Sequence, residues 1–262
     1  AALCTSTVVL PVGITNELHE PPFFHGVLRP DLERNLIPAT WNENGLGLHG
    51  RIGGVRYQAY LLNGLDASGG LTSTTWIRNA RTGGDRSPAR TFAGVLALAG
   101  EVGPITVGGS LYRGRAGQGT PGIEADVTLA EVHARAAWRG LEAKALLAAG
   151  ALGDAGAVAP GEVIGSRVRG GYLEVAWDVL GWLAPGGEAA LLPFVRWEAM
   201  DLNAEVPAGL TPDPEAAATV LTAGLTLRPL PTVAVKADWQ RRESDAPAGP
   251  VDQLNLGVGF AF

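Results

Sequence analysis

Residues 252–262, DQLNLGVGFAF, decide the fold. From Leu254 onward every second side chain is large and apolar, and the side chains between are asparagine, glycine or alanine; the apolar set is Leu254, Leu256, Val258, Phe260 and Phe262. A β-strand points successive side chains to opposite faces, so this stretch predicts one apolar face and one face of small or polar groups. A soluble sheet would carry charged and hydroxyl side chains on the second face. A transmembrane β-barrel instead turns its apolar face to lipid and the other face to its lumen.

Stretches upstream alternate in the same way, and their charged residues fall on one face only. In 218–228 and 232–240 this pattern predicts that Leu225 and Val235 face lipid, as Leu256 does. The same pattern places Gly224 and Ala234 in the lumen. The alternation therefore extends over the second half of the chain.

Clusters of glycine, proline and asparagine separate about twelve predicted strands. We place them near residues 5–11, 41–51, 54–64, 90–101, 104–114, 123–138, 140–151, 167–180, 188–200, 218–228, 232–242 and 252–262. The number is even, as in bacterial single-chain barrels. The expected fold is all-β: a transmembrane, antiparallel, up-and-down β-barrel in a single domain, 1–262.

Composition narrows the function classes. Charged residues make up 18% of the chain, below the usual quarter, and no run of about 18 apolar residues could form a spanning helix. The net charge of −6 argues against a nucleic-acid partner. A single cysteine, Cys4, excludes internal disulfides and multi-cysteine zinc sites, and Leu3 before it does not favour a lipid anchor. The chain has no initiator methionine, so we expect a processed form or a fragment.

The connections between the predicted strands alternate between long and short. Short periplasmic turns opposite long extracellular loops are typical of outer-membrane barrels. This alternation assigns tryptophans to two rings at the membrane interfaces. The short-turn ring is Trp138, Trp177 and Trp182, and the long-loop ring is Trp41, Trp197 and Trp239.

Two predicted strands are irregular. Val127 and Leu129 alternate out of phase with Val132 and Trp138 in 123–138, which predicts a bulge near Ala130. The stretch 140–151 is rich in alanine and leucine and has helix propensity, but its charges alternate with small apolar residues. We therefore expect a strand there.

The segment 11–50 resembles the phosphate-selective porin O and P family and related outer-membrane porins. The similar residues are Pro11-Val12-Gly13, Asn16-Glu17, His19-Glu20-Pro21-Pro22, Gly26-Val27, Arg29-Pro30, Ile37-Pro38, Thr40-Trp41 and Glu43, with later echoes at Tyr60 to Ala67, at Glu131 to Ala134 and at Trp138 to Leu141. The C-terminal phenylalanine likewise resembles the closing strand of bacterial outer-membrane proteins. The resemblance implies a channel in a bacterial outer membrane, with no cofactor and no catalysed reaction, and a possible homotrimer. Such porins have roughly sixteen strands, so about four are expected before Ala1.

The long connection 12–40 is expected to fold inward and narrow the channel, with its Phe23-Phe24 and Leu36-Ile37 pairs packed against the wall. The predicted constriction residues are Glu17, His19, Glu20, Arg29 and Arg34, with the two arginines beside Glu43. His19 and His25 with Glu17 and Glu20 could also be drawn as a metal cluster, but Pro21-Pro22 interrupts it, so we expect no metal. A surface cap that leaves the channel open is the alternative for this segment.

Fourteen charged residues fall on the predicted lumen face: Glu43, Arg51, Arg56, Glu131, Arg135, Glu142, Lys144, Glu174, Asp178, Arg196, Glu198, Arg228, Lys236 and Asp238. Seven are acids and seven are bases, which predicts a water-filled, weakly selective pore. No serine alternates near His49 or His133, so a barrel lipase is not expected.

The leading hypothesis is a passive diffusion porin for small hydrophilic solutes or inorganic anions, with membrane lipid around it. The alternatives are a non-conducting barrel with a structural or adhesive role, and a soluble β protein.

Overall fold

The computed structural model describes residues 2–68, 70–83, 90–184 and 186–261, with the backbone alone for residues 2–6. Twelve antiparallel strands form one sheet in which each strand pairs with the next along the chain. The strands are β1 Ala2–Val9, β2 Asn42–Ile52, β3 Val55–Asn63, β4 Phe92–Val102, β5 Ile105–Arg115, β6 Asp126–Trp138, β7 Leu141–Leu152, β8 Arg167–Trp177, β9 Ala190–Glu205, β10 Ala217–Leu230, β11 Val233–Ser244 and β12 Val251–Phe260. The predicted up-and-down order is confirmed.

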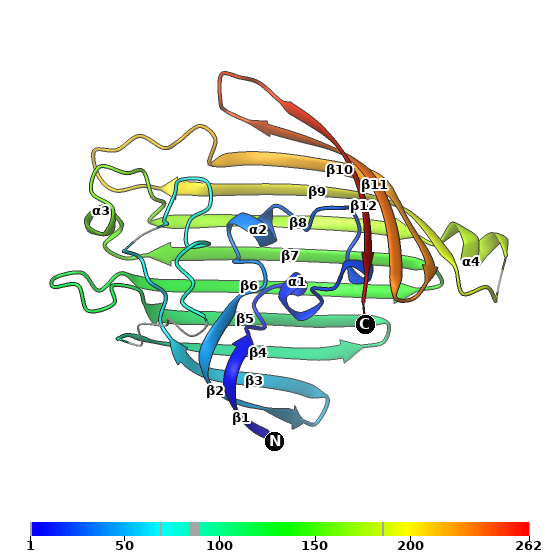
Figure 1. Cartoon of the computed structure of the whole chain (residues 1–262), viewed down its shortest axis with the longest axis horizontal. Helices are drawn as coiled ribbons and strands as arrows, with labels where there is room; N and C mark the ends of the chain where they lie inside the picture. Colours follow the sequence, from blue (N-terminus) through cyan, green and yellow to red (C-terminus); the bar gives the residue numbers. More distant parts are fainter. Residues whose placement is uncertain (1, 69, 84–89, 185, 262) are drawn as a thin grey trace.

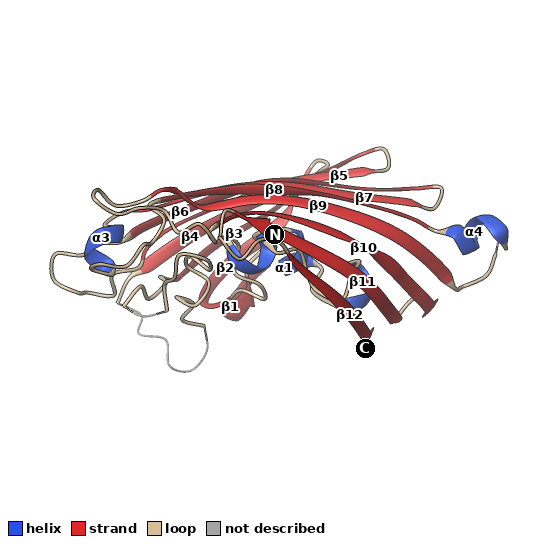
Figure 2. Cartoon of the chain, turned by 90° about the horizontal axis from the view of Figure 1, so that it is seen from above, coloured by secondary structure: helices blue, strands red, loops and turns tan. Residues whose placement is uncertain are grey.

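The sheet curves into an open arch, seen from above in Figure 2. Strands β1 and β12 are its two edges, and they do not pair with each other within the described ranges. The short helices are α1 Ile14–Glu17, η1 Pro21–Phe23, α2 Leu32–Asn35, α3 Ala155–Val158 and α4 Val179–Leu183. Figure 1 shows α1 and α2 in front of the concave face, with α3 and α4 at opposite ends of the strands. No described helix has the length and apolar character needed to cross a membrane.

The outer, convex face is apolar, as the alternation predicts. In β12 the side chains of Leu254 and Leu256 are each 83% exposed, and Leu225 and Val235 are also exposed. Ala234 is fully buried on the inner face. Phe262 lies outside the described residues. The outer face therefore has the chemistry of a surface made for lipid.

The small residues of β12 face the inner side for a steric reason. A β-carbon at Gly259 would collide with the ring of Pro21, and one at Gly257 would lie 3.0 Å from Val27. Both neighbours belong to the connection between β1 and β2. Glycine thus lets this connection approach the terminal strand closely.

Five of the six tryptophans predicted at the membrane interfaces are at least partly exposed. Trp138, Trp177, Trp182 and Trp197 are exposed, and Trp239 is partly exposed. The prediction for Trp41 is wrong, because its ring is fully buried inside the arch. It packs on Tyr112, with ring centroids 4.7 Å apart, and donates its indole N–H to Glu43 over 3.0 Å.

The bulge predicted in β6 is also wrong. The strand pairs with β5 and with β7 without any shift in register. Val127 and Leu129 face inward and are buried, whereas Val132 faces outward. Near the long-loop end the inner face is apolar, so apolar residues on the lumen side need no bulge. The expected strand over 140–151 is confirmed as β7.

An apolar core inside the arch explains that inner face. Leu10, Leu36 and Trp41 from the β1–β2 connection pack with Trp76 from the β3–β4 connection and with wall residues such as Leu129. The indole N–H of Trp76 donates to the carbonyl of Gly165 over 3.0 Å, so the β3–β4 connection reaches across to the chain before β8. The core fills the long-loop half of the arch.

Candidate functional site

Residues 10–41, here called the inner loop, run along the concave face between β1 and β2 (Figure 1). The loop is held together by Glu33, which is fully buried. One carboxylate oxygen accepts the backbone N–H and the hydroxyl of Thr15 over 2.6 and 2.9 Å, and the other accepts the hydroxyl of Tyr172 over 2.6 Å. Burial raises the pKa of Glu33 despite these bonds. The carboxyl thus joins α1 and α2 to strand β8.

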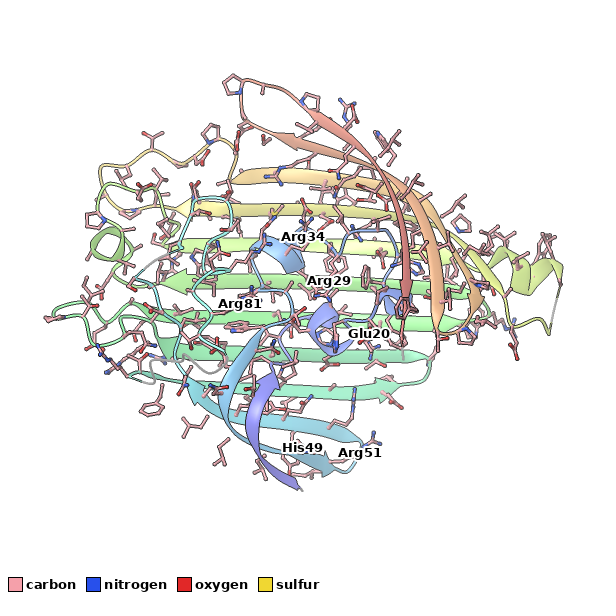
Figure 3. The ribbon with its side chains drawn as sticks, in the orientation of Figure 1. Glu20, Arg29, Arg34, His49, Arg51 and Arg81 are labelled. Atoms are coloured by element: carbon pink, nitrogen blue, oxygen red, sulfur yellow. The ribbon has the colours of Figure 1, made fainter. Side chains whose placement is uncertain are left out.

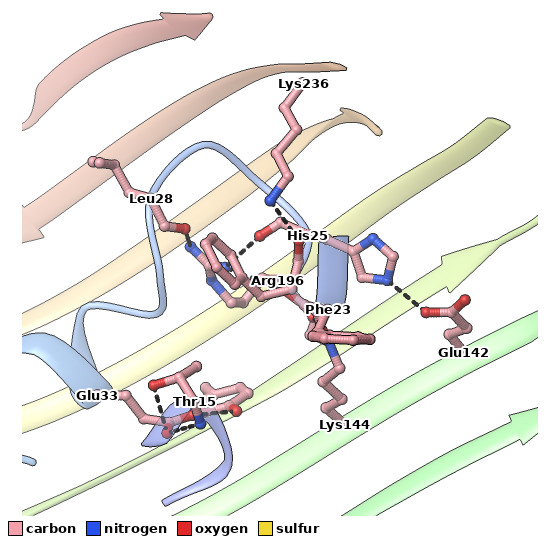
Figure 4. Close-up of polar contacts among 12 residues, drawn as sticks. Thr15, Phe23, His25, Leu28, Glu33, Glu142, Lys144, Arg196 and Lys236 are labelled. Atoms are coloured by element: carbon pink, nitrogen blue, oxygen red, sulfur yellow. Dashed lines mark hydrogen bonds and ion pairs between the residues drawn. The ribbon is translucent and has the colours of Figure 1, made fainter. Parts of the chain in front are cut away.

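Basic side chains of the wall bind carbonyl oxygens of the inner loop (Figure 4). The ammonium of Lys144 donates to the carbonyl of Phe23 over 2.9 Å, and that of Lys236 to the carbonyl of Phe24 over 2.6 Å. The guanidinium of Arg196 donates to the carbonyls of His25 and Leu28 over 3.3 Å each. These bases therefore hold a loop and do not face open water.

Acidic side chains between these bases bind N–H groups of the same loop. Asp238 accepts the backbone N–H of Val27 over 2.6 Å, and Glu198 accepts that of Leu32 over 3.1 Å. The ring of His25 lies 3.1 Å from the carboxylate of Glu142. Burial lowers the pKa of His25, although Glu142 opposes this shift. The wall and the loop are complementary in both donors and acceptors.

The wall charges under the loop also pair with one another. Arg196 lies 3.1 Å from Glu174 and 2.9 Å from Glu198, and Lys144 lies 3.2 Å from Glu174. Arg228 lies 2.8 Å from Glu142. Buried charges are tolerated only when they are paired and hydrogen-bonded in this way.

The fourteen predicted lumen charges therefore fall into groups. Eight lie on the inner face of β7–β12 and pair with one another or with the inner loop; we call this region the covered wall. They are Glu142, Lys144, Glu174, Arg196, Glu198, Arg228, Lys236 and Asp238. Asp178 accepts the backbone N–H of Leu191, Glu43 accepts from Trp41 and Thr82, and Glu131 pairs with His133 over 2.8 Å.

The remaining three, Arg51, Arg56 and Arg135, lie on the inner face at the short-turn ends of β2–β6, which we call the open wall. Within the described ranges none of the three forms an ion pair, and their side chains are exposed or half-buried. The acid on the same part of the wall is Glu101, beside Thr106. Figure 3 shows Arg51 beside His49 on the strands far from α2.

The register places like charges directly opposite each other there. Arg51 is the partner of Arg56, and Arg135 is the partner of Lys144. Such pairs destabilise a sheet, whereas the next pairs along the covered wall, Lys144 with Glu174 and Glu174 with Arg196, have opposite sign. Cross-strand pairs of charged residues thus have the same sign at the open wall and opposite signs along the covered wall.

The predicted constriction residues lie on the inner loop, half-buried. The imidazole of His19 is 3.4 Å from Glu20, and Glu17 is close enough to His133 to act on it electrostatically. Arg29 donates to the hydroxyl of Thr40 and to the carbonyl of His19, both over 2.8 Å. Whether these residues narrow a channel stays a prediction.

Two expectations for the loop differ from the structure. Arg29 and Arg34 are not bonded to Glu43; Arg34 pairs with Asp31 over 3.1 Å, and the arginine whose charge acts on Glu43 is Arg81. Phe24, Leu36 and Ile37 are buried as expected, but Phe23 is 49% exposed. His25 turns to the wall and away from His19. Within the described residues no three His, Cys, Asp or Glu side chains gather as metal ligands would.

Sequence reasoning missed the residues that anchor the loop. Thr15, Glu33 and Tyr172 form one buried network, and the amide of Asn16 accepts the N–H of Trp41 over 3.2 Å and donates to the carbonyls of Val12 and Pro38. The available signal was that the alternation in β8 places Tyr172 on the inner face, because a buried tyrosine hydroxyl usually forms a hydrogen bond. Nothing in the sequence points from Tyr172 to Glu33.

Comparison with known proteins gives the following. No protein-family model matches the chain. A curated relative from Aquifex aeolicus (strain VF5), described as an uncharacterized protein, is 30% identical over 253 residues, which cover 90% of this chain and 57% of the relative. The chain thus spans little more than half the length of that relative.

Solved structures are similar in fold. A loop L8 deletion mutant of OmpT, an outer membrane protein of Vibrio cholerae, gives a TM-score of 0.58 at 11% identity, covering 98% of this chain and 74% of that one. OmpT has a trimer form with a TM-score of 0.55 at 13% identity, covering 98% of this chain and 75% of that one. Salmonella typhi OmpF in complex with daunomycin gives 0.54 at 13%, covering 83% and 61%. The chain has the antiparallel up-and-down fold of porin-like outer-membrane barrels.

Proposed function

We propose that the protein is an outer-membrane channel in which small hydrophilic solutes and ions diffuse passively along the open wall. The observation that carries the proposal is the uncovered group of Arg51, Arg56 and Arg135. The two like-charge pairs that these arginines form, Arg51 with Arg56 and Arg135 with Lys144, work against sheet stability, which favours a role outside folding. The porin-like fold and the apolar outer face support placement in a bacterial outer membrane. The proposal includes no catalytic step and no cofactor.

The uncovered charges favour anions. The open wall carries three arginines against one acid, Glu101. The balance of seven acids and seven bases that predicted weak selectivity includes pairs that the inner loop buries. In a narrow passage a few fixed charges of one sign decide which ions pass. The resemblance of 11–50 to the phosphate-selective porin O and P family fits this preference, so inorganic phosphate is the first solute to test.

The test is current through a planar bilayer under a potassium chloride gradient. The wild type is expected to conduct, with a reversal potential that shows preference for chloride. Changing Arg51, Arg56 and Arg135 together to Gln should shift the reversal potential toward cations. A control with Arg167→Gln and Arg241→Gln, two exposed arginines paired with acids elsewhere, should leave it unchanged. An unshifted potential in the triple variant would sink the proposed selectivity.

A non-conducting barrel is the second candidate, because the inner loop buries so much of the covered wall. Arg196, Glu174 and Glu198 are each at most 2% exposed, so these wall charges are shielded from water. Insertion into the bilayer without any current would favour this candidate. A homotrimer is proposed for either candidate, and chemical cross-linking in the membrane would test it.

A further inference from the structure

A groove of about 940 Å³ lies on the outer face and runs obliquely from the middle of β7 to the long-loop end of β11. Its floor is formed where Gly171 of β8 pairs with Ala199 of β9. Leu147, Leu173 and Trp197, all exposed, stand around this floor. A groove of this size lies within the range of small-molecule sites.

Small residues create the groove and keep it open. A β-carbon at Gly171 would lie 2.9 Å from the carbonyl oxygen of Leu146 and closer still to the side chain of Leu147. Ala199 next to it adds only a methyl group. The outward residues Leu147, Leu173 and Trp197 beside them are large, so the groove deepens where glycine and alanine pair.

The side chains that line the groove change from apolar to charged along its length. The mid-wall part is lined by carbon from Leu147, Leu173 and Trp197. At the long-loop end, Arg169 lies 3.9 Å from Asp201, and Glu243, two strands away on β11, lies 2.8 Å from Arg241. One end is therefore apolar, and the other offers a guanidinium together with carboxylates.

We infer that this groove binds an acyl chain of a membrane lipid whose headgroup carries both a phosphate and an amine. The chain fills the apolar part, Arg169 faces the phosphate, and Asp201 with Glu243 faces the amine. Between lipid tails no hydrophobic force favours one apolar surface over another, so retention comes from packing in the groove and from these charges. The inference rests on the proposed membrane placement but not on conduction.

The complementarity favours a lipid over a second copy of the chain. A zwitterionic headgroup carries one negative and one positive charge, which complement Arg169 and the carboxylates of Asp201 and Glu243 at the end, or rim, of the groove. The headgroup is joined to a flexible tail that can follow an oblique groove. A second copy would instead require a projecting apolar side chain flanked by opposite charges. Oligomer contacts at this face are therefore an outcome of the test.

The test is native mass spectrometry of the full chain after reconstitution with dioleoyl phosphatidylethanolamine and extraction into detergent. The wild type should retain one lipid. Ala199→Phe fills the floor and should reduce the retained fraction at least tenfold. Ala237→Phe adds the same ring to an outward position of β11 outside the groove and should retain the lipid as the wild type does. Thr219→Phe, on the β10 side, replaces Ala199→Phe if that variant does not insert.

Equal retention in the filled and control variants would overturn the inference. Loss of an oligomer peak in Ala199→Phe, with lipid retention unchanged, would also overturn it and would identify the groove as an interface between copies. Arg169→Gln should weaken retention of the ethanolamine lipid, and an unchanged value would remove the assigned role of the rim. Flotation of the wild type with vesicles tests membrane placement separately. Failure there would overturn the proposed function and the inference together, whereas loss of current alone would leave the inference standing.

Discussion

The covered wall and the open wall are parts of one sheet, but they treat charge differently. In the covered wall acids and bases alternate from strand to strand, as in Lys144, Glu174 and Arg196, and each is buried against a partner. In the open wall arginine faces arginine, and the side chains stay accessible. Pairing of this kind holds a loop in place, whereas the unpaired arginines are available to act on solutes in the proposed channel.

The difference teaches that the inner loop, and not the wall by itself, decides which charges reach water. The loop presents carbonyls to Lys144, Lys236 and Arg196 and N–H groups to Asp238 and Glu198. It leaves the short-turn ends of β2–β6 free. A total charge count over the whole lumen therefore does not tell which charges would give the proposed channel its selectivity.

The largest expected effect contrasts one arginine from each region. Arg196→Met leaves the buried carboxylate of Glu198 without an ion-pair partner and leaves Glu174 with Lys144 alone, so it should cost roughly 3–5 kcal/mol of unfolding free energy. Arg135→Met should change stability by no more than about 0.5 kcal/mol, because this side chain has no ion pair in the described chain. Urea unfolding of the detergent-folded protein measures both. Equal costs would remove the distinction between the regions.

The outer face should show no such contrast. Leu225→Arg behind the covered wall and Leu96→Arg behind the open wall both place a charge on the apolar face. Each should cost roughly 2–4 kcal/mol near the midplane of the bilayer. Refolding into vesicles at increasing urea gives the two values. A large cost at only one of them would show that part of the arch does not face lipid.

Tyrosine hydroxyls provide a finer contrast. Tyr172→Phe removes a donor from the buried carboxylate of Glu33 and should cost about 1–3 kcal/mol. Tyr60→Phe removes a bond of 2.9 Å to Gln58 on β3, where the site is only part-buried, and should cost about 1 kcal/mol or less. The same unfolding assay applies. A larger loss at Tyr60 would mean that the Glu33 network does not anchor the loop.

The smallest expected effect concerns pH. Burial lowers the pKa of His25 below 6.5, so its contribution to loop docking is present above pH 6.5 and is lost as the pH falls through the lowered pKa. Glu142, Glu174 and Lys144 face the ring. Glu33 acts with the opposite sign, since its raised pKa favours docking at lower pH. Protease cleavage of the loop at pH 5 relative to pH 7.5 should therefore increase more in the wild type than in His25→Gln. The same ratio in both would exclude His25 as the titrating group.

Much of the fold was predictable, because alternation reports the face of every residue in a strand. It predicted all twelve strands and the exposed row in β12. Alternation does not tell what lies against the inner face, so Trp41 and the phase of Val127 and Leu129 were misread. The inner face is apolar in its long-loop half because two loops pack against it. This packing joins residues far apart in the sequence, so no local sequence pattern predicts it.

The site was predictable in part. The inner face of thirteen of the fourteen charges followed from the sequence, and so did the inward fold of the loop; the prediction for Asp178 is wrong, because β8 ends at Trp177 and Asp178 precedes α4. The sequence could also have predicted that the unpaired arginines and the paired charges lie on different strands. Neighbouring strands follow each other along the chain, so the order of the charged residues in the sequence gives their positions around the sheet. Counting seven acids against seven bases discarded that order. The loop contacts use backbone carbonyls, as at Phe23 and Leu28, which no side-chain pattern reveals.

Access of water to the two regions tests the central claim most directly. Thr106 lies on the open wall beside Arg135, and Thr222 lies on the covered wall beside Arg196. Each is changed to Cys in a Cys4→Ser background, and bilayer current is followed while a small charged thiol reagent is added. The current should change in Thr106→Cys and stay constant in Thr222→Cys, whose threonine is 1% exposed. Rapid modification of Thr222→Cys, with no response in Thr106→Cys, would show that solutes pass along the wall that the loop covers, and would contradict the account.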